Sequence, residues 1–579
     1  MQLHCLLAVV TVGILGHTSA ALNGTLPNHP LNGWYPCHDF TFSDTAGSTG
    51  QEFSECAVYT APLCYPGICE PSEFAKPTVD IFVKRLPATV GDAKTAHNVW
   101  LLEGGPGYAS NKLETRLVEL HTLLEGAVNV YTMDHRGTGR STLLECVAAQ
   151  ITTTGSTLGI KIHPSEVPSC ARELQMKYGD LASFSTTSAA MDISSFISKF
   201  SNGASSIVYG KSYGTVVVER LMLLNTPTVA GYVLDGVVTT SAASPKYISN
   251  WDDDVGEVAE HFMELCEQDS TCGSHFQSAN LSVTLQDLIT RIDNDPNSTC
   301  AALLSNWTDS TFTSPSSVLR KTLSEILKST KTRTLIPPVV YRLNRCDSND
   351  VEILNQFFTT MNSPPSSEEA PFRSELLFRL IIFSELWQRP SPSTNEMETR
   401  FTNASIADGI YEMLPLYCAF SKEKSATCDE LRLGNYEGEG IIYQRDQYWG
   451  KRVKIPTQAS VLLMSGKLDP QTAHKYAEYL LDALDGSNKE LITFDYAPHI
   501  AVSSNTLYND ATGITRSCGM DLLASYVSNN GDLQHLDRSC MSEMTAFNLT
   551  VPIEYVQDYF GTNEAYDGVY DASFSLAEE

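Results

Sequence analysis

The sequence predicts an α/β fold in which a mostly parallel, doubly wound sheet is interrupted by a mainly helical insertion. Short apolar runs without alternation are typical of strands buried on both faces of a parallel sheet, and helical patterns lie between these runs. This alternation of strand and helix patterns is interrupted between about residues 241 and 430, and the strand pattern resumes at 460. The expected strands cover residues 57–63, 79–85, 99–103, 128–134, 207–209, 232–235, 460–465 and 491–494.

Composition divides the chain into five segments. Residues 1–20 form an apolar stretch that ends in small residues, which predicts a secretory signal peptide. The first part of the sheet core is expected over 21–240, a helical cap over 241–430 and the second part of the core over 431–550. A tail with seven acidic residues and no basic ones follows over 551–579, and we expect it either to dock on the body or to be mobile. The signal peptide predicts a secreted, extracellular protein.

Charge and hydropathy exclude several classes of partner. The chain holds 39 Lys and Arg against 68 Asp and Glu, a formal charge of −29, and 42% of its residues are hydrophobic. Nucleic-acid binding needs clustered basic side chains, so a nucleic-acid partner is not expected. No run beyond the signal peptide approaches about 20 apolar residues, so no membrane span is expected either. Composition leaves the oligomeric state open.

The cysteines and glycosylation signals are those of an exported chain. Fourteen cysteines follow the predicted signal peptide, and this even number indicates up to seven disulfides. Neither a CxxC pair nor an HExxH helix occurs, so no metal or other cofactor is expected. The candidate glycosylation sites are Asn23, Asn280, Asn297, Asn306, Asn403 and Asn548.

A serine flanked by glycines is the first candidate catalytic residue. Gly210-Lys211-Ser212-Tyr213-Gly214 follows an apolar strand and opens a helical pattern, which is the GxSxG nucleophile elbow. In such a turn the strained backbone lifts the serine hydroxyl clear of the sheet, and the bare flanking positions let strand and helix approach. Ser212 is therefore the predicted nucleophile.

A serine hydroxyl needs a base, and that base needs an acid to orient it. In hydrolases with this elbow, the chain order is serine, then acid, then histidine. Asp469 and His499 each follow a predicted strand in that order, so they are the predicted acid and base. His474 is a second candidate for the base, and Asp235 and Asp495 are further candidates for the acid.

A glycine-rich loop could hold the negative charge that develops on the substrate oxygen. Gly104-Gly105-Pro106-Gly107 follows the strand expected at 99–103, and such a loop lets bare backbone N–H groups approach a reacting carbonyl. The N–H of Tyr213, the residue after the nucleophile, would supply a second donor. A phosphate-binding loop is excluded because no GK[ST] follows at the required spacing.

Four motifs in order carry a family resemblance. They are GGPG at 104–107, DHRGTGRS at 134–141, YGKSYGT at 209–215 and LDGVV at 234–238. Together they resemble the tripeptidyl and prolyl aminopeptidase family of α/β-hydrolases. The segment 55–63 is similar to that family's first strand. Near the end of the chain, Cys518, Tyr526, Gly531 and Cys540 are similar to the C-terminal module of the tripeptidyl-aminopeptidase branch.

The resemblance implies an α/β-hydrolase fold with an inserted cap, and it implies roles for single residues. Ser212 would be the nucleophile, His499 the general base and then acid, and Asp469 the residue that orients it. Gly105 and Tyr213 would form the oxyanion hole. The resemblance also makes Cys518 and Cys540 a candidate disulfide.

Further roles follow from the same resemblance. Asp134 and Arg136 look like loop-organising residues, with an internal ion pair that shapes the turn. The cap segment Phe383-Ser384-Glu385 resembles the family's Cys-Ser-Glu segment, which makes Glu385 the candidate that binds the free α-amine of a substrate. Glu103 stands where prolyl aminopeptidases usually have histidine, which favours the tripeptidyl-type branch.

These inferences predict a secreted serine exopeptidase, an aminopeptidase of the di/tripeptidyl or prolyl type. Its substrates would be peptides with a free N-terminus, cleaved through a Ser-His-Asp triad and an acyl-enzyme. A secreted carboxylesterase or lipase on the same fold is the alternative, because acyl transfer serves both chemistries. A non-catalytic binding protein on a hydrolase scaffold is a more remote one.

Overall fold

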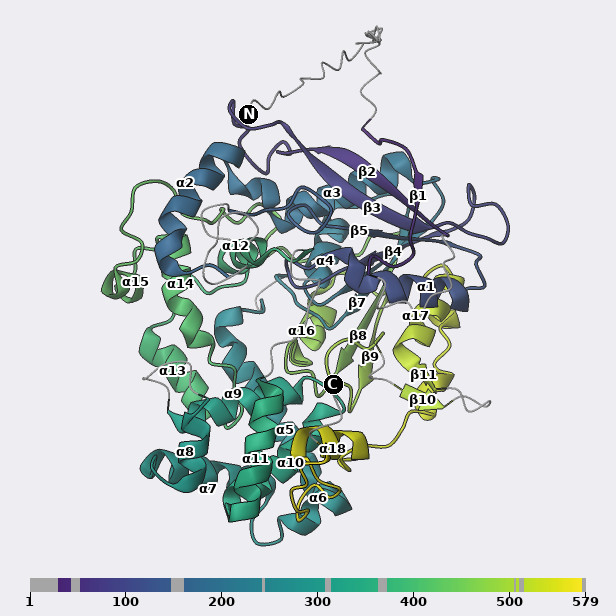
Figure 1. Ribbon diagram of the computed structural model, residues 1–579. Helices are drawn as coiled ribbons and strands as arrows, with labels where there is room; N and C mark the ends of the chain where they lie inside the picture. The colour runs from purple at the N-terminus through teal and green to yellow at the C-terminus, as the bar shows by residue number, and fades with distance from the viewer. Residues whose placement is uncertain are drawn as a thin grey trace, which may run out of the picture.

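The protein is described by a computed structural model that covers residues 30–42, 53–146, 161–241, 245–307, 314–362, 372–503, 507–509 and 515–574. The predicted signal peptide and Asn23 lie outside these residues. Figure 1 shows a sheet flanked by helices, joined to a second body that consists of helices.

In the described residues, nine strands form one sheet in the order β1-β2-β3-β5-β4-β6-β7-β8-β9. β3 is antiparallel to β2 and to β5, whereas every pair from β5–β4 to β8–β9 is parallel. This sheet and its flanking helices are the α/β-hydrolase fold, so the predicted fold class is confirmed. The strands are β1 (Tyr35–Cys37), β2 (Ser54–Pro62), β3 (Thr78–Leu86), β4 (Asn98–Leu102), β5 (Asn129–Met133), β6 (Ser206–Lys211), β7 (Val229–Asp235), β8 (Ser460–Gly466) and β9 (Lys489–Phe494), with a separate hairpin of β10 (Leu507–Asn509) and β11 (Thr515–Ser517).

Both faces of the sheet are covered, which explains the apolar runs without alternation. Val99 and Leu101 of β4 belong to one core with helices α1 and α17, while Trp100 and Leu102 point into the opposite core with α3 and α4. Successive side chains of a strand point to opposite faces, so a doubly covered strand needs apolar residues at every position. The helices outside the insertion are α1 (Glu114–Leu123), α2 (Val167–Tyr178), α3 (Thr186–Phe200), α4 (Gly214–Leu224), α16 (Lys475–Ala483), α17 (Cys518–Ser528) and α18 (Ile553–Phe560).

The strand order places the candidate site. β4 lies between β5, which follows it in the chain, and β6, which comes later. Open α/β sheets bind their ligands outside the carboxyl ends of the strands at such a reversal of strand order. β4 leads into the Gly104–Gly107 loop and β6 leads into Ser212, so both predicted elements lie at this point.

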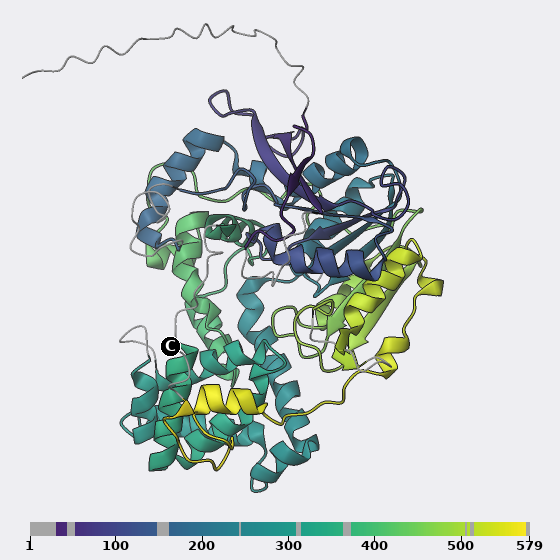
Figure 2. The same ribbon diagram turned by 45° about the vertical axis from the view of Figure 1, so that its right-hand side comes forward.

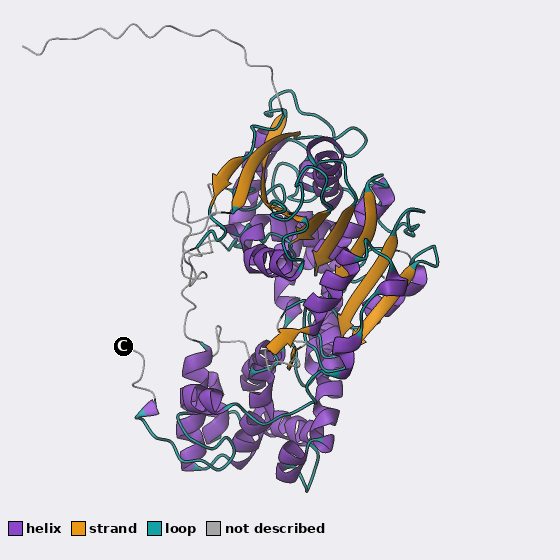
Figure 3. Cartoon of the chain, turned by 90° about the vertical axis from the view of Figure 1, so that its right-hand side faces the viewer, coloured by secondary structure: helices purple, strands orange, loops and turns teal. Residues whose placement is uncertain are grey.

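The insertion between β7 and β8 has two kinds of packing. Helices α5 to α11 share an apolar core of their own, with Phe262, Leu323 and Phe357 fully buried in it. Helices α12 and α14 instead pack into the core beneath the sheet. Figure 3 shows the first group as a body of helices apart from the strands. The insertion holds α5 (Trp251–Gln268), α6 (Ser270–His275), α7 (Leu281–Asn294), α8 (Thr299–Ser305), α9 (Pro315–Leu327), α10 (Ile336–Arg345), α11 (Ser348–Met361), α12 (Glu375–Glu385), α13 (Thr394–Asn403), α14 (Leu414–Ser421) and α15 (Ala426–Leu431).

The acidic tail crosses from the sheet to the insertion. Figure 2 shows its yellow helix α18 lying across the helices of the insertion, whereas α17, the preceding helix of the chain, lies beside the sheet. Phe560 of α18 is fully buried in the core of the insertion. The Arg342 guanidinium donates hydrogen bonds to the carbonyls of Ala565 at 2.7 Å and Gly568 at 3.2 Å. Of the two expectations for the tail, the structure therefore shows docking for residues up to 574.

All fourteen cysteines beyond residue 20 take part in disulfides in the described residues. Each disulfide joins cysteines that are 5 to 46 positions apart, so every bridge closes a local segment. The predicted number of seven is met, and Cys518 is joined to Cys540. The pairs are Cys37–Cys56, Cys64–Cys69, Cys146–Cys170, Cys266–Cys272, Cys300–Cys346, Cys418–Cys428 and Cys518–Cys540.

Candidate active site

Ser212 lies in the sharp turn between β6 and α4. Its φ of 52° is in the left-handed region, which is strained for a residue with a side chain. A Cβ on Gly210 would come within 2.4 Å of the carbonyl oxygen of Gly214, and one on Gly214 within 2.8 Å of that of Leu102. No side chain fits at either position, which is the physical reason for both glycines of the motif.

Asp469 and His499 are brought together by the loops that follow β8 and β9. Oδ2 of Asp469 lies 2.8 Å from Nδ1 of His499 and accepts a 2.6 Å hydrogen bond from the Thr472 hydroxyl. Its Oδ1 accepts from the N–H groups of Gln471 and Thr472, both at 2.9 Å. Burial raises the pKa of Asp469, but His499 and these donors outweigh burial and hold the pKa below its usual value. The carboxylate is thus kept ionised beside the imidazole.

The segment at the end of β7 connects the serine turn with His499. The N–H of Ser212 donates to the carbonyl oxygen of Asp235 at 2.8 Å. The next residue, Gly236, lies against the imidazole, since a Cβ placed on it would be 2.9 Å from Cε1 of His499. The three residues of the predicted triad therefore gather at the carboxyl ends of β6, β8 and β9, on either side of β7.

Asp235, which the sequence offers as a second candidate acid, is engaged by other groups. Its carboxylate accepts hydrogen bonds from the N–H of Ala501 at 2.7 Å, the N–H of Val502 at 2.9 Å and the Tyr209 hydroxyl at 2.9 Å. Burial raises its pKa, and these donors oppose that effect. Ile500, between His499 and these N–H groups, has a φ of 70°, an outlier for a β-branched residue. The hydrogen bonds from Ala501 and Val502 to Asp235 thus hold in place the strained turn that contains His499.

The glycine loop after β4 lies directly over the serine. A Cβ on Gly104 would be 2.9 Å from Cβ and 3.5 Å from Oγ of Ser212, so the loop can pass the serine only as bare backbone. Within the described residues, neither the N–H of Gly105 nor that of Tyr213 has a hydrogen-bond acceptor. Both donors are therefore available to a ligand oxygen.

Glu103 is buried beside this loop. Its Oε1 accepts from the N–H of Gly104 at 3.0 Å and pairs with the ammonium group of Lys211, also at 3.0 Å. Lys211 immediately precedes Ser212, so this ion pair joins the loop after β4 to the serine turn. Sequence reasoning identified Glu103 only as a departure from a family pattern and did not predict this pair.

Asp134 and Arg136 organise their loop, but they pair with other residues and not with each other. Asp134 binds Arg140 at 2.8 Å and accepts from the Ser110 hydroxyl at 2.5 Å. Arg136 makes two hydrogen bonds to Asp192 of α3, at 2.6 and 2.7 Å, in a fully buried pair. An ion pair between the two motif residues is therefore not formed, because each side chain reaches a partner outside the Asp134–Arg136 turn.

Glu385 is a buried residue at the end of α12. Its carboxylate pairs with Arg220 at 3.0 Å and accepts hydrogen bonds from the Tyr443 hydroxyl at 2.7 Å and the N–H of Thr186 at 3.3 Å. The Thr186 hydroxyl in turn accepts from the Tyr213 hydroxyl at 3.1 Å. Glu385 thus lies near the side chain that follows the serine, with its charge already balanced by a guanidinium.

Asp495 and His474, the remaining candidates for acid and base, are engaged with charged groups of their own. Asp495 is exposed and pairs with Lys467 at 2.7 Å. The Nε2 of His474 is 3.7 Å from Glu478, and burial lowers the pKa of this histidine despite that carboxylate. Of the three candidate acids, Asp469 is the one whose carboxylate lies within hydrogen-bond distance of His499.

The remaining predictions concern surfaces. The described glycosylation candidates, Asn280, Asn297, Asn306, Asn403 and Asn548, are all exposed. In the described residues no three His, Cys, Asp or Glu side chains gather in a way that could hold a metal ion. Nor does any helix among those residues have the length and apolar character that a membrane crossing requires.

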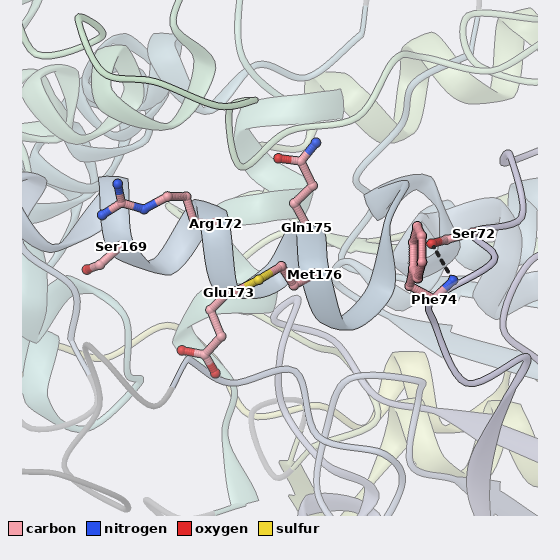
Figure 4. A pocket seen from close by; sticks show the side chains of 7 residues that line it. All are labelled: Ser72, Phe74, Ser169, Arg172, Glu173, Gln175 and Met176. Carbon is pink, nitrogen blue, oxygen red and sulfur yellow. Dashed lines mark hydrogen bonds between the residues drawn. The ribbon is translucent and has the colours of Figure 1, made fainter.

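A hollow of about 700 Å³ lies along α2 and contains none of the predicted site residues. Figure 4 shows the side chains that line it, among them Phe74 and Met176, which are 89% and 71% exposed. The complete lining is Ser72, Phe74, Ser169, Arg172, Glu173, Gln175 and Met176.

Comparisons with known proteins add little to this description. No family model and no curated protein matches the chain. Among solved structures, the mouse alpha/beta hydrolase domain-containing protein 10 matches 80% of this chain and 96% of its own at 10% identity and a TM-score of 0.29. A putative hydrolase from Agrobacterium vitis matches 83% and 99% at 12% identity and a TM-score of 0.29. An esterase from Exiguobacterium antarcticum matches 74% and 91% at 12% identity and a TM-score of 0.28. Such distant likenesses carry no argument about activity, and the class of this protein rests on its own topology.

Proposed function

We propose that this protein is a secreted serine hydrolase that removes residues from the free N-terminus of peptides. The observation that carries the proposal is the Asp469–His499 hydrogen bond of 2.8 Å on loops next to a serine in the strained β6–α4 turn. Ser212 attacks the scissile carbonyl, and His499 takes its proton while Asp469 orients the imidazole. The N–H groups of Gly105 and Tyr213 hold the oxyanion.

The reaction then proceeds through an acyl-enzyme. His499 returns the proton to the leaving amine, and water, activated by the same imidazole, releases the acyl group from Ser212. The peptidase assignment within this chemistry is supported by the resemblance of the four motifs to the tripeptidyl and prolyl aminopeptidase family. Glu385 is the proposed anchor for the substrate's α-amine.

A secreted carboxylesterase is the second candidate, and one observation favours it. Arg220 balances the charge of Glu385, so this carboxylate offers a substrate ammonium less attraction than an unpaired one would. An esterase needs no amine anchor. The two candidates differ in whether acetylation of the substrate's α-amine abolishes cleavage.

The test uses matched substrates and variants. Purified protein should cleave a chromogenic tripeptide anilide with a free amine and leave its N-acetylated form intact, whereas an esterase would cleave acetylated amino-acid esters regardless. Ser212→Ala should lower kcat by about 10⁴-fold or more, since the nucleophile is lost. Glu385→Gln should raise KM for the free-amine peptide and leave that for a neutral ester unchanged. Full activity of Ser212→Ala would refute the serine mechanism.

A further inference from the structure

A cavity of about 290 Å³ lies where the sheet body, the insertion and the chain between α17 and α18 meet. The insertion contributes Thr330 and Arg333, and the sheet body contributes the end of β9, the turn that follows it and Leu507 of β10. Residues 544–548 of the chain between α17 and α18, the crossing segment, complete the lining. None of the triad residues lines it. The lining residues are Thr330, Arg333, Phe494, Tyr496, Ala497, Leu507, Met544, Thr545, Ala546, Phe547 and Asn548.

Arg333 is the unusual member of this lining. It is only 3% exposed, and within the described residues its guanidinium makes no hydrogen bond and no ion pair. Its Nη1 is buried without an acceptor, and the group lies 5.7 Å from the centre of the Phe547 ring. A guanidinium carries five N–H donors, so this side chain brings unused donors to the wall of a cavity.

Three arginines that are buried even more deeply than Arg333 are all paired with carboxylates. Arg136 binds Asp192, Arg220 binds Glu385 and Arg342 binds Asp350, each at 3.0 Å or less. An isolated buried charge is costly, and a fold normally supplies it with a counter-ion. Burial lowers the pKa of Arg333 to about 10, with no carboxylate opposing it, so the group is still charged at neutral pH.

The positive charge of Arg333 and the aromatic side chains that line the cavity together indicate the chemical class of its ligand. We propose that this cavity binds a small monocarboxylate with an aromatic or apolar body, whose carboxylate pairs with Arg333. A single cation balances a single negative charge, and the planar guanidinium fork matches a carboxylate in a two-point contact. Phe494, Tyr496 and Phe547 supply aromatic walls for the rest of the molecule. The volume lies at the lower end of ligand pockets, which limits the ligand to a small one.

This site is independent of the proposed hydrolysis. The ligand would touch Tyr496 and Ala497, which precede His499 in the same turn, as well as Arg333 of the insertion and Phe547 of the crossing segment. It would therefore bind across all three parts of the molecule at once, and it should stabilise their junction.

The test measures binding to the full-length Ser212→Ala protein, so that turnover has no part in it. Phenylacetate is the probe, phenylacetamide its neutral counterpart, and inorganic phosphate the small anion without an apolar body. Calorimetry should show saturable binding of phenylacetate with a Kd of about 1 mM or lower. Phenylacetamide should bind at least about tenfold more weakly, because it lacks the charged contact. Equal binding of the two would overturn the proposal, and so would tighter binding of phosphate.

Two variants identify the cation. Arg333→Met should weaken phenylacetate binding at least about tenfold. Lys331→Met is the matched control, since it removes an exposed positive charge two residues away that does not line the cavity, and it should bind as before. Unchanged binding by Arg333→Met would refute the site. If that variant does not fold, Arg333→Lys keeps the charge but loses the fork, and wild-type affinity in it would refute the two-point contact.

Discussion

Replacement of Asp235 by asparagine tests whether one buried carboxylate holds the His499 turn in place. The carboxylate accepts three hydrogen bonds, from Ala501, Val502 and Tyr209. Asparagine keeps one acceptor oxygen and turns the other into an NH₂ donor, which would face a donor. At least one buried donor then loses its acceptor, at a cost of about 1–3 kcal/mol in the free energy of unfolding. A shift of the turn by about 1 Å would lower kcat by about 10²-fold.

The assay combines urea unfolding with kinetics on the substrate that the wild type cleaves. The loss should appear in kcat, and in the rate at which a fluorophosphonate labels Ser212, because the base is displaced. Asp495→Asn is the matched control, since Asp495 is an exposed acid in the turn that leads to His499. This change should alter the free energy of unfolding by less than about 0.5 kcal/mol. If Asp235→Asn kept both wild-type stability and the wild-type labelling rate, Asp235 would have no positioning role.

Three further predictions concern pH and packing. The pKa of Asp469 is held below its usual value, so its ionised form stabilises the fold above about pH 4, and this stabilisation is lost as the pH falls through the lowered pKa. In Asp469→Asn the free energy of unfolding should therefore fall less between pH 4 and lower pH than it does in the wild type. The same fall in both proteins would contradict this role of Asp469. Phe560→Ala should cost about 3–5 kcal/mol in urea unfolding, since the ring is fully buried, and a cost below about 1 kcal/mol would show that the tail does not stabilise the insertion. Arg136→Met leaves the buried charge of Asp192 without a counter-ion and should cost about 3–5 kcal/mol in urea unfolding. The double variant with Asp192→Leu should recover only part of this cost, because Arg136 also donates hydrogen bonds to the carbonyls of Leu63 and Ser183.

The local part of this architecture could be predicted from the sequence. The eight predicted strands overlap β2 to β9. β4, β5 and β8 in particular read as runs without alternation because every one of their residues is buried. The glycines around Ser212 predict the turn, since their positions leave no room for a side chain. The edge strand β1 has only three residues, two of them exposed and one half-buried, and gives no such signal.

Long-range pairing could not be predicted in the same way. The partner of Arg136 is Asp192, 56 positions later, and the partner of Glu385 is Arg220, 165 positions earlier. Nothing in the local pattern distinguishes these residues from other charged ones. For the same reason the sequence left the tail undecided, since the guanidinium of Arg342 that binds it lies more than 200 positions away. The absence of a described partner for Arg333 is likewise a property of the folded chain.

The docked tail has a consequence for anyone who engineers this protein. The insertion is held by its two covalent links to the sheet and, through residues 549–574, by a third connection that returns from the far end of the chain. Excising the insertion, or transplanting one from another scaffold, would therefore leave Phe560 and its apolar neighbours without a cover. A chimera that is meant to fold must exchange the insertion and the chain from Leu549 onward as one unit.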